Sequence, residues 1–410
     1  MRTLIISDLH LGCGAAPGIF AGAAALAELL SSLHKPLRVV LNGDTFDFVA
    51  HDIPGGTGAI YLHSRALLED ARTIAVLTTL AAGVADRGEL LICVGAHDRE
   101  LALRPLQELL RGHMKPEHGA SPRLRFIAGE TPTRLSVGRA RVLVTPGLHQ
   151  QVDAGDLWLA RHVLNPLRRE FGVGLADLLR PDYPAAVLAA LAVNPTAARQ
   201  VFREPAGEAA WRQLTGATPV GSGLRLDEAL TRAGLTERER DVMMQALDPE
   251  ASAASHDRAL DATRLKLFRA ALTTHAGRPT AAPRSLSVGE RAAAHTLATS
   301  GRAQAVITAS THAVGWAEDE GLVVVDTGAW TWLAVVPAAD DDDAQWQRCL
   351  EAWQRTPRIG ERPGLPTPIA ARFTGALLEP QASGRGTLLA LVEWRAGELL
   401  RLHEQALIGP

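Results

Sequence analysis

Acidic and imidazole side chains follow short apolar runs at three places in the chain. Asp8 and His10 come directly after the run 3–6, Asp44 follows the run 37–41, and His312 follows the run 305–307. In extended backbone, side chains two residues apart face the same side, so the carboxylate of Asp8 and the imidazole of His10 can reach one ion. Carboxylate and imidazole ligands together suit Zn, Mn or Fe. We therefore predict a site for a divalent transition metal at Asp8, His10, Asp44 and His312.

These residues could also have structural roles that involve no metal. Asp8 could cap the turn that follows it, and Asp44 could form an Asx turn with Gly43. Taken singly, these structural readings are the better ones. Their order after successive predicted strands favours a common metal site.

The elements that would position these residues alternate along the chain. The apolar runs are three to five residues long and bounded by turn residues, which is typical of buried strands. They span residues 3–6, 37–41, 90–94, 141–144, 305–307 and 322–325. Segments 21–33 and 63–85 show helical periodicity between the first strands. This alternation predicts an α/β fold with its chemistry at the carboxyl ends of the strands.

A different pattern begins near residue 156, where strand-like runs give way to leucine, alanine and arginine at helical spacing, as in residues 157–164. Thr236 with Glu239, and Ser287 with Glu290, fit capping boxes that begin helices. Strand-like runs return at residue 303, and residues 387–403 read as a terminal hairpin. We predict a discontinuous core, residues 1–153 and 301–400, with a helical insertion at 154–300 and a short C-terminal end at 401–410.

Four motifs in this order resemble the signature of calcineurin-like metallophosphoesterases. Residues 8–10 match D-x-H, residues 43–47 match G-D-x-x-D, residues 95–98 read G-A-H-D where the family has G-N-H-D, and residues 310–312 read S-T-H where it has H-x-H. Residues 326–330, D-T-G-A-W, are similar to the N-T-G-x-W segment of many members. The resemblance covers about 250 residues and implies a four-layer αββα sandwich with metals between the strand ends.

Three positions depart from the family pattern, and all three belong to one of its two metals. Ala96 replaces the asparagine, Pro146 stands in the H-G-H motif, and Ser310 replaces a histidine. The resemblance assigns Asp8, His10, Asp44 and His312 to the other metal, and that set is complete. The sequence therefore predicts about one ion or a repurposed fold. His149, three residues after Pro146, could restore the second site, or it could be a surface or supporting histidine.

His97 and Asp47 have a separate role in the resemblance. The family's histidine in this motif resembles a general acid that protonates the leaving oxygen, and the second aspartate of G-D-x-x-D holds it. A histidine oriented by a carboxylate suits proton transfer near neutral pH. The alternative is a structural pair that supports the loop, and Asp98 is expected to fix the turn.

Composition limits the partners and the location. A formal net charge of -3 over 410 residues gives no electrostatic reason to expect nucleic acid. Three widely spaced cysteines suggest neither a disulfide framework nor a cysteine zinc site. The N-terminus has no signal-peptide pattern and no apolar run reaches membrane-helix length, so we expect a cytoplasmic protein.

Two functions fit these residues. The first is a metal-dependent phosphoester hydrolase acting on a phosphorylated small molecule or a phosphodiester. The second is a catalytically silent relative that binds a phosphorylated ligand, or a protein partner through the helical insertion. The complete first metal set with His97 and Asp47 favours the enzyme, whereas the three losses favour the silent relative.

Overall fold

The computed structural model of the chain describes most of the predicted core and part of the predicted insertion. The described residues are 1–12, 19–48, 56–84, 87–115, 123–128, 131–148, 183–195, 230–231, 233–247, 258–273, 283–309, 311–355, 369–382 and 386–408. The predicted helical run at 157–164, and the residues His149 and Ser310, lie outside these ranges.

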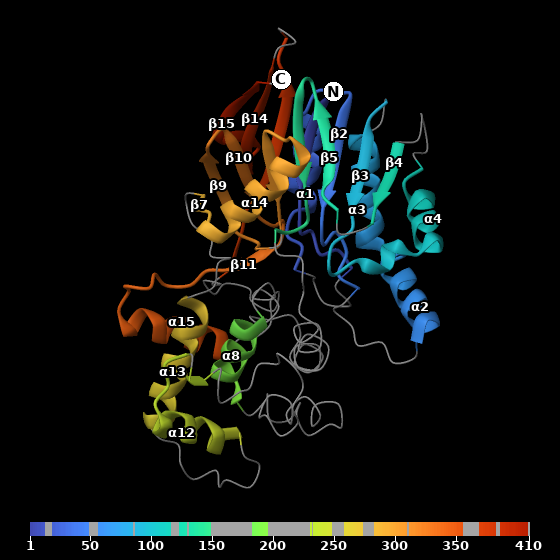
Figure 1. The fold of residues 1–410 in the computed structure, drawn as a ribbon. Helices are drawn as coiled ribbons and strands as arrows, with labels where there is room; N and C mark the ends of the chain where they lie inside the picture. The colour runs from blue at the N-terminus through green and yellow to red at the C-terminus, as the bar shows by residue number, and fades with distance from the viewer. Residues whose placement is uncertain are drawn as a thin grey trace.

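One sheet contains the strands that precede the first predicted ligands. Its described strands have the order β15-β14-β13-β1-β2-β3-β4 (Figure 1). Their bounds are β1 Arg2–Ile6, β2 Leu37–Asn42, β3 Glu89–Cys93, β4 Arg123–Ile127, β13 Phe373–Pro380, β14 Gly386–Arg395 and β15 Glu398–Ile408. The strands β1 to β4 are parallel, and β13 joins β1 antiparallel. The predicted terminal hairpin is confirmed as β14 and β15, and the predicted boundary at residue 400 falls inside β15.

A second sheet carries the strands around His312. Its described strands have the order β5-β6-β8-β10-β9-β7. Their bounds are β5 Thr133–Val137, β6 Ala140–Val144, β7 Arg284–Ser285, β8 Ala305–Thr308, β9 Val314–Asp319 and β10 Leu322–Thr327. The central strands β6, β8 and β10 are parallel. Strand β7 was not expected, because two residues are too few to show a strand pattern.

Alternating side chains along the buried strands pack in two directions. Ile5 and Val40 of the first sheet pack in one cluster with Ile307 and Val325 of the second. Their neighbours along β1, including Leu4, belong to a different cluster with the helices that follow β1 to β3. The two sheets therefore share an apolar core, as strands buried on both faces require.

Helices cover the other face of each sheet. Those beside the first sheet are α1 Ala23–Ser32, α2 Gly56–Leu68, α3 Ala71–Gly83 and α4 Arg104–His113, with the short 3-10 helix η2 Arg99–Ala102 before α4. Helix α14, Val288–Gly301, packs on the second sheet and begins with the predicted capping box of Ser287 and Glu290. The predicted helical segment 63–85 is two helices, because the Asp70 side chain accepts the backbone N–H of Arg72 and begins α3. The predicted α/β class is confirmed.

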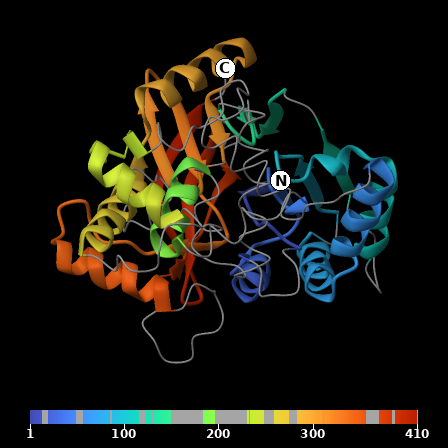
Figure 2. The ribbon, with the colours of Figure 1, turned by 90° about the horizontal axis from the view of Figure 1, so that it is seen from below.

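The remaining described helices form a separate lobe. They are α8 Tyr183–Val193, α12 Glu237–Leu247, α13 Arg258–Thr273 and α15 Asp343–Arg355. Figure 1 shows them beyond the end of the sheets at which the short strand pair β11 Trp332–Ala334 and β12 Ile369–Ala371 lies. Seen from that end, they lie on the side of the second sheet, away from α1 to α3 (Figure 2).

Helix α15 joins this lobe although it follows the motif residues in the chain. The rings of Phe268 on α13 and Trp346 on α15 meet edge to face with centroids 6.2 Å apart. Arg269 Nη1 lies 2.7 Å from Asp343 Oδ1. The region 154–300 thus contributes α8, α12 and α13 to the lobe. It also contributes β7 to the second sheet and most of α14, the helix that packs on that sheet.

Removing the Trp346 side chain is expected to loosen the lobe without changing metal binding at the predicted ligands. Trp346 is fully buried, and truncating a buried tryptophan costs about 3–5 kcal/mol. Trp346→Ala should therefore lower the denaturant midpoint and speed proteolysis within the lobe, while metal content stays that of the wild type. A variant that loses its metal with the lobe would show that the two parts do not act separately.

Candidate metal centre

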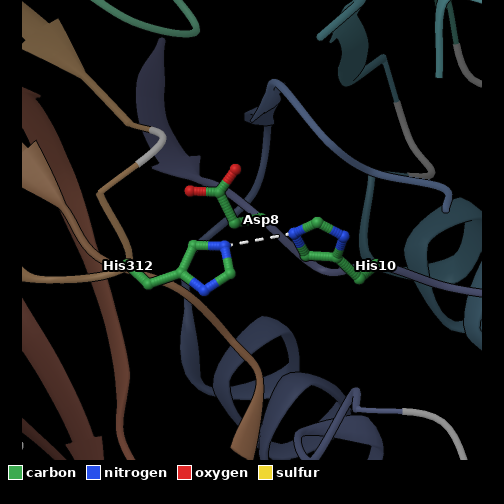
Figure 3. Close-up of side chains that lie close together, drawn as sticks. All are labelled: Asp8, His10 and His312. Carbon is green, nitrogen blue, oxygen red and sulfur yellow. Dashed lines mark hydrogen bonds between the residues drawn. The ribbon is translucent and has the colours of Figure 1, made fainter. Parts of the chain in front are cut away.

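Three of the four predicted ligands converge on one point. Asp8, His10 and His312 offer ligand atoms that all lie within 4.8 Å of one another, and all three residues are buried. The Nε2 atoms of His10 and His312 point toward each other and are 3.1 Å apart, beside the Asp8 carboxylate (Figure 3). Residues 302 positions apart in the chain thus meet where β1 and β8 end.

The loops after β1 and β2 are held together by backbone hydrogen bonds beyond the strands. The N–H of His10 donates to the carbonyl of Asp44 at 2.9 Å, and the N–H of Asp47 donates to the carbonyl of Leu11 at 3.0 Å. The loop after β2 is joined to β3 in turn, because the Gly43 N–H donates to the Cys93 carbonyl at 2.9 Å. These bonds explain why side chains that follow successive strands meet.

The predicted ligands share an uncommon backbone conformation. Among the described residues, eight other than glycine have positive φ, and four of these are Asp8, His10, Asp44 and His312, at 51°, 47°, 32° and 56°. A non-glycine residue held there costs on the order of 1–3 kcal/mol, and such residues cluster at functional sites. The surrounding structure therefore maintains this strain at all four predicted ligands.

Asp44 lies beside the converging group but belongs to neither described cluster of potential metal ligands. Its Oδ1 accepts the backbone N–H of His97 at 2.9 Å. The close approach requires a glycine at position 95, where an added Cβ would lie 2.3 Å from that same oxygen. Asp44 therefore ties the loops after β2 and β3 together, and its role as a ligand stays a prediction.

Two of the three positions that depart from the family pattern carry apolar side chains close to the loop of Asp44. Pro146 packs against the loop, since a Cβ added at Gly43 would lie 2.9 Å from the Pro146 Cβ. Ala96 directly precedes His97, whose N–H is bonded to Asp44. Neither the Pro146 nor the Ala96 side chain carries a ligand atom, so the described residues at these positions offer no side-chain ligand to a second ion.

His97 and Asp47 form the predicted pair. His97 Nδ1 lies 3.0 Å from Asp47 Oδ1, and the Asp47 carboxylate is completely buried. The other Asp47 oxygen lies 3.9 Å from His10 Nδ1, so one carboxylate faces both histidines. The Asp47 carboxylate thus fixes the side of the His97 ring that carries Nδ1. The link to His10 was not foreseen from the sequence.

Asp98 organises the loops, as its position in the motif suggested. Its carboxylate accepts the backbone N–H groups of Thr45, Phe46 and Gly95. Burial, together with the nearby carboxylate of Asp44, raises the pKa of Asp98 to about 7. All its hydrogen bonds are made to backbone, which supports a structural role.

The segment 326–330 packs against the end of β1. Ser7 Oγ donates to the carbonyl of Gly328 and also bonds the hydroxyl of Thr327, both at 2.6 Å. The Trp330 N–H donates to the Asp8 carbonyl at 3.3 Å, and its indole N–H donates to the Thr374 carbonyl at 2.7 Å. The two sheets are thereby joined beside the converging ligands.

A buried ionic cluster behind His312 was missed in the sequence. Arg284 donates to both carboxylate oxygens of Glu290, at 2.5 and 2.9 Å, and to Asp326 at 3.1 Å. Burial raises the pKa of Asp326 to about 6, against hydrogen bonds from Thr311 and Arg284 that lower it. Arg284 lies on the unforeseen strand β7, so no periodicity or motif drew attention to it.

The pH dependence of stability is expected to reveal this cluster. Burial alone would raise the pKa of Glu290, but hydrogen bonds from Arg284 and Ser287 outweigh it and lower the pKa to about 2. The folded chain then holds a proton on Glu290 more weakly than the unfolded chain, so this stabilisation is complete above pH ~4.5 and is lost as the pH falls toward ~2. Its full size is roughly 3 kcal/mol.

The measurement compares Glu290→Gln with the wild type by denaturant unfolding at pH 7 and pH 3.5. The difference in unfolding free energy should shrink by about half at the lower pH. Glu351→Gln is the control, because Glu351 pairs with Arg355 on the surface, where an ion pair contributes little. A difference for Glu290→Gln that is independent of pH would contradict the lowered pKa.

The converging group fits a divalent transition metal. Two ligands each about 2.0–2.1 Å from one ion in tetrahedral geometry lie roughly 3.3 Å apart, close to the 3.1 Å between the two histidine nitrogens. Two imidazoles and one carboxylate form a ligand set found in catalytic sites, in which a further position stays open for water or substrate. The described residues therefore include a group that could bind a metal.

Comparison with known proteins returns only distant structural similarity. The chain is similar to a single mutant of Vps29 from Entamoeba histolytica, at 10% identity and a TM-score of 0.33, with 99% of each chain covered. It is also similar to wild-type Vps29 from that organism complexed with Zn²⁺, at 9% identity and a TM-score of 0.30, again over 99% of each chain. For GAP50, the anchor in the inner membrane complex of Plasmodium, the values are 9% and 0.37, over 100% of this chain and 89% of that one.

At the level of sequence, no protein-family model matches the chain and no curated protein matches it significantly. None of the described helices has the length and apolar composition that crossing a membrane requires. We therefore base the function on the geometry of the residues themselves.

Proposed function

We propose that this protein is a metal-dependent phosphoester hydrolase of the calcineurin-like metallophosphoesterase type, with a site for one divalent ion of Mn, Zn or Fe. The proposal includes the four-layer αββα sandwich of that family, with core residues 1–153 and 301–400. The observation that carries it is the convergence of Asp8, His10 and His312 next to the His97–Asp47 pair. Asp44 completes the proposed ligand set from the neighbouring loop.

An ion bound by these residues would act as a Lewis acid toward a phosphoryl oxygen. The protein's own part begins with Asp47, which accepts the Nδ1–H of His97 and thereby orients the ring. As a water molecule attacks phosphorus and releases a proton to solvent, the bond from phosphorus to the leaving oxygen breaks, and His97 donates a proton from Nε2 to that oxygen. The other Asp47 oxygen lies 3.9 Å from His10 Nδ1, so the same carboxylate also provides a negative charge close to a proposed ligand.

The role of His97 predicts a dependence on the leaving group. His97→Gln should lower turnover of alkyl phosphoesters by about 10²–10⁴-fold, because an alkoxide must be protonated as it leaves. Hydrolysis of a p-nitrophenyl ester should fall much less, because that leaving group needs no proton. Asp47→Asn should show the same pattern, and His97→Gln should leave the metal content unchanged.

His295→Gln is the matched control, because His295 is a partly exposed histidine on α14. Its Nε2 lies 3.5 Å from Asp319 Oδ2. This variant should retain wild-type rates with both substrates. Equal losses with both leaving groups in His97→Gln, or loss of metal, would refute the general-acid role.

The apolar positions on the second-metal side favour a second candidate function. With Ala96 and Pro146 beside Asp44, the protein could hold a phosphorylated ligand, or a protein partner through the helical lobe, without turning it over. Saturable phosphate binding with no turnover of any phosphoester in Mn²⁺, Zn²⁺ or Fe²⁺ would support this function and refute the hydrolase.

The few cysteines, with Cys93 buried and not in a disulfide, support a cytoplasmic location for either function.

A further inference from the structure

The turn that presents His312 is closed by its neighbour's side chain. His312 has a φ of 56°, and the residues on either side of it are joined, because the Ala313 N–H donates to Thr311 Oγ1 at 3.2 Å. A serine or threonine hydroxyl that bonds the backbone two residues on forms a local turn of this kind. The Thr311 hydroxyl therefore helps to keep His312 in a conformation that is strained for a histidine.

The Thr311 hydroxyl is itself fixed from behind. It donates to Asp326 Oδ2 at 2.6 Å, and Asp326 is completely buried at the end of β10. The other Asp326 oxygen accepts the Gly328 N–H at 3.1 Å. Because both carboxylate oxygens are engaged and no water reaches them, the position of Asp326 determines where the Thr311 hydroxyl lies.

Arg284 holds Asp326 in that position. Its Nη2 donates to Asp326 Oδ2 at 3.1 Å and lies 3.4 Å from Thr311 Oγ1, while Glu290 anchors the same guanidinium from the other side. Arg284 pairs with Gly315 between β7 and β9, and a Cβ at Gly315 would lie 3.6 Å from the Arg284 Cγ. That distance is ordinary van der Waals contact, and the atom closest to an added Cβ is Leu286 Cδ2 at 2.7 Å. The pairing of β7 with β9 therefore places Arg284 at the cluster.

We propose that Arg284 is a positioning residue of the metal centre, acting through Asp326 and Thr311 on the turn that directs His312 toward Asp8 and His10. The inference rests on the proposed function, because it requires that His312 bind the ion. It goes beyond that function, because metal affinity would then depend on Arg284, a residue before α14 that is not itself a metal ligand. Supporting partners of this kind typically contribute about 10–100-fold to metal affinity.

The test measures the metal dissociation constant of the full chain by competition with a chromophoric chelator. Thr311→Val removes the hydroxyl at nearly constant volume, and Arg284→Lys keeps the charge but cannot bridge Glu290 and Asp326 in a planar fork. Both should bind Zn²⁺ about 10–100-fold more weakly than the wild type, whereas Thr311→Ser should restore most of the affinity. Arg291→Ala is the matched control, since Arg291 donates to the Leu286 carbonyl nearby and should bind as the wild type does.

A double-mutant cycle separates positioning from a general loss of structure. If Thr311 acts only through His312, Thr311→Val should weaken Zn²⁺ binding in the wild type and have no further effect on the residual, weaker binding of His312→Ala, which is titrated at higher Zn²⁺ concentrations. An equal loss in both backgrounds, or wild-type affinity in both Thr311→Val and Arg284→Lys, would overturn the positioning role while leaving the metal centre in place. A wild-type chain that binds no Zn²⁺ would overturn the proposed function and this inference together.

Discussion

Replacing His312 with alanine is expected to reduce the metal content of the purified protein from about one ion per chain to near zero, and any hydrolysis with it. The loss should exceed the ~10–100-fold that removal of a supporting partner costs, because a ligand itself is removed. Asp8→Ala and Asp44→Ala should behave in the same way if each supplies a ligand. The measurement is elemental analysis after dialysis against a weak chelator, together with phosphoesterase assays.

His403→Ala is the control for this loss. His403 stacks on Trp316 with ring centroids 5.3 Å apart, on β15 rather than in either described ligand group. It removes an imidazole from the same chain and should leave the metal content unchanged. Retention of a full ion by both His312→Ala and Asp8→Ala would place the metal elsewhere.

Restoring the family's residues on the second-metal side is expected to have the opposite effect. The triple replacement Ala96→Asn, Pro146→His and Ser310→His should raise the content toward about two ions, because a carboxylate such as that of the proposed ligand Asp44 can bridge two cations. A second ion stabilises transition-state charge by several kcal/mol, so turnover of phosphodiesters should rise roughly 100-fold or more. Ala96→Asn alone should have a small effect.

A matched set of control variants tests whether the new ligands or the altered packing cause the change in metal content and turnover. Ala96→Gly, Pro146→Ala and Ser310→Ala open the same positions without adding a ligand atom, and they should leave both metal content and turnover unchanged. The outcome that contradicts the prediction is a triple variant that folds, holds about one ion and hydrolyses no faster than the wild type.

The sequence located the converging residues because strand ends are easy to recognise. Apolar runs of three to five residues identified β1, β2 and β8. The parallel strands β1 and β2 bring their carboxyl ends to one edge of the first sheet, so the polar residues that follow them lie near one another. His312 follows β8 of the second sheet, and its meeting with Asp8 and His10 was expected from the order of the motifs. The His97–Asp47 pair was expected from the resemblance to the phosphoesterase motifs, and its residues follow β3 and β2.

Other features depend on contacts that no local pattern encodes. Arg284 lies on a two-residue strand, and its role appears only when β7 pairs with β9 and brings it to Asp326. Asp44 follows its strand as predicted, but the hydrogen bond from the His97 N–H depends on how the loops after β2 and β3 meet. Helix α15 packs with α13 through Trp346, a contact between segments separated by the whole of α14, β8, β9 and β10.

The number of ions bound by the unmodified chain tests the central claim most directly. Protein purified without added chelator and analysed for Mn, Fe and Zn should contain about one transition-metal ion per chain, bound through His312 and lost in His312→Ala. Two tightly bound ions with rapid phosphodiester hydrolysis would show that His149 or another group has replaced the missing ligands. That result would contradict a centre built for one ion.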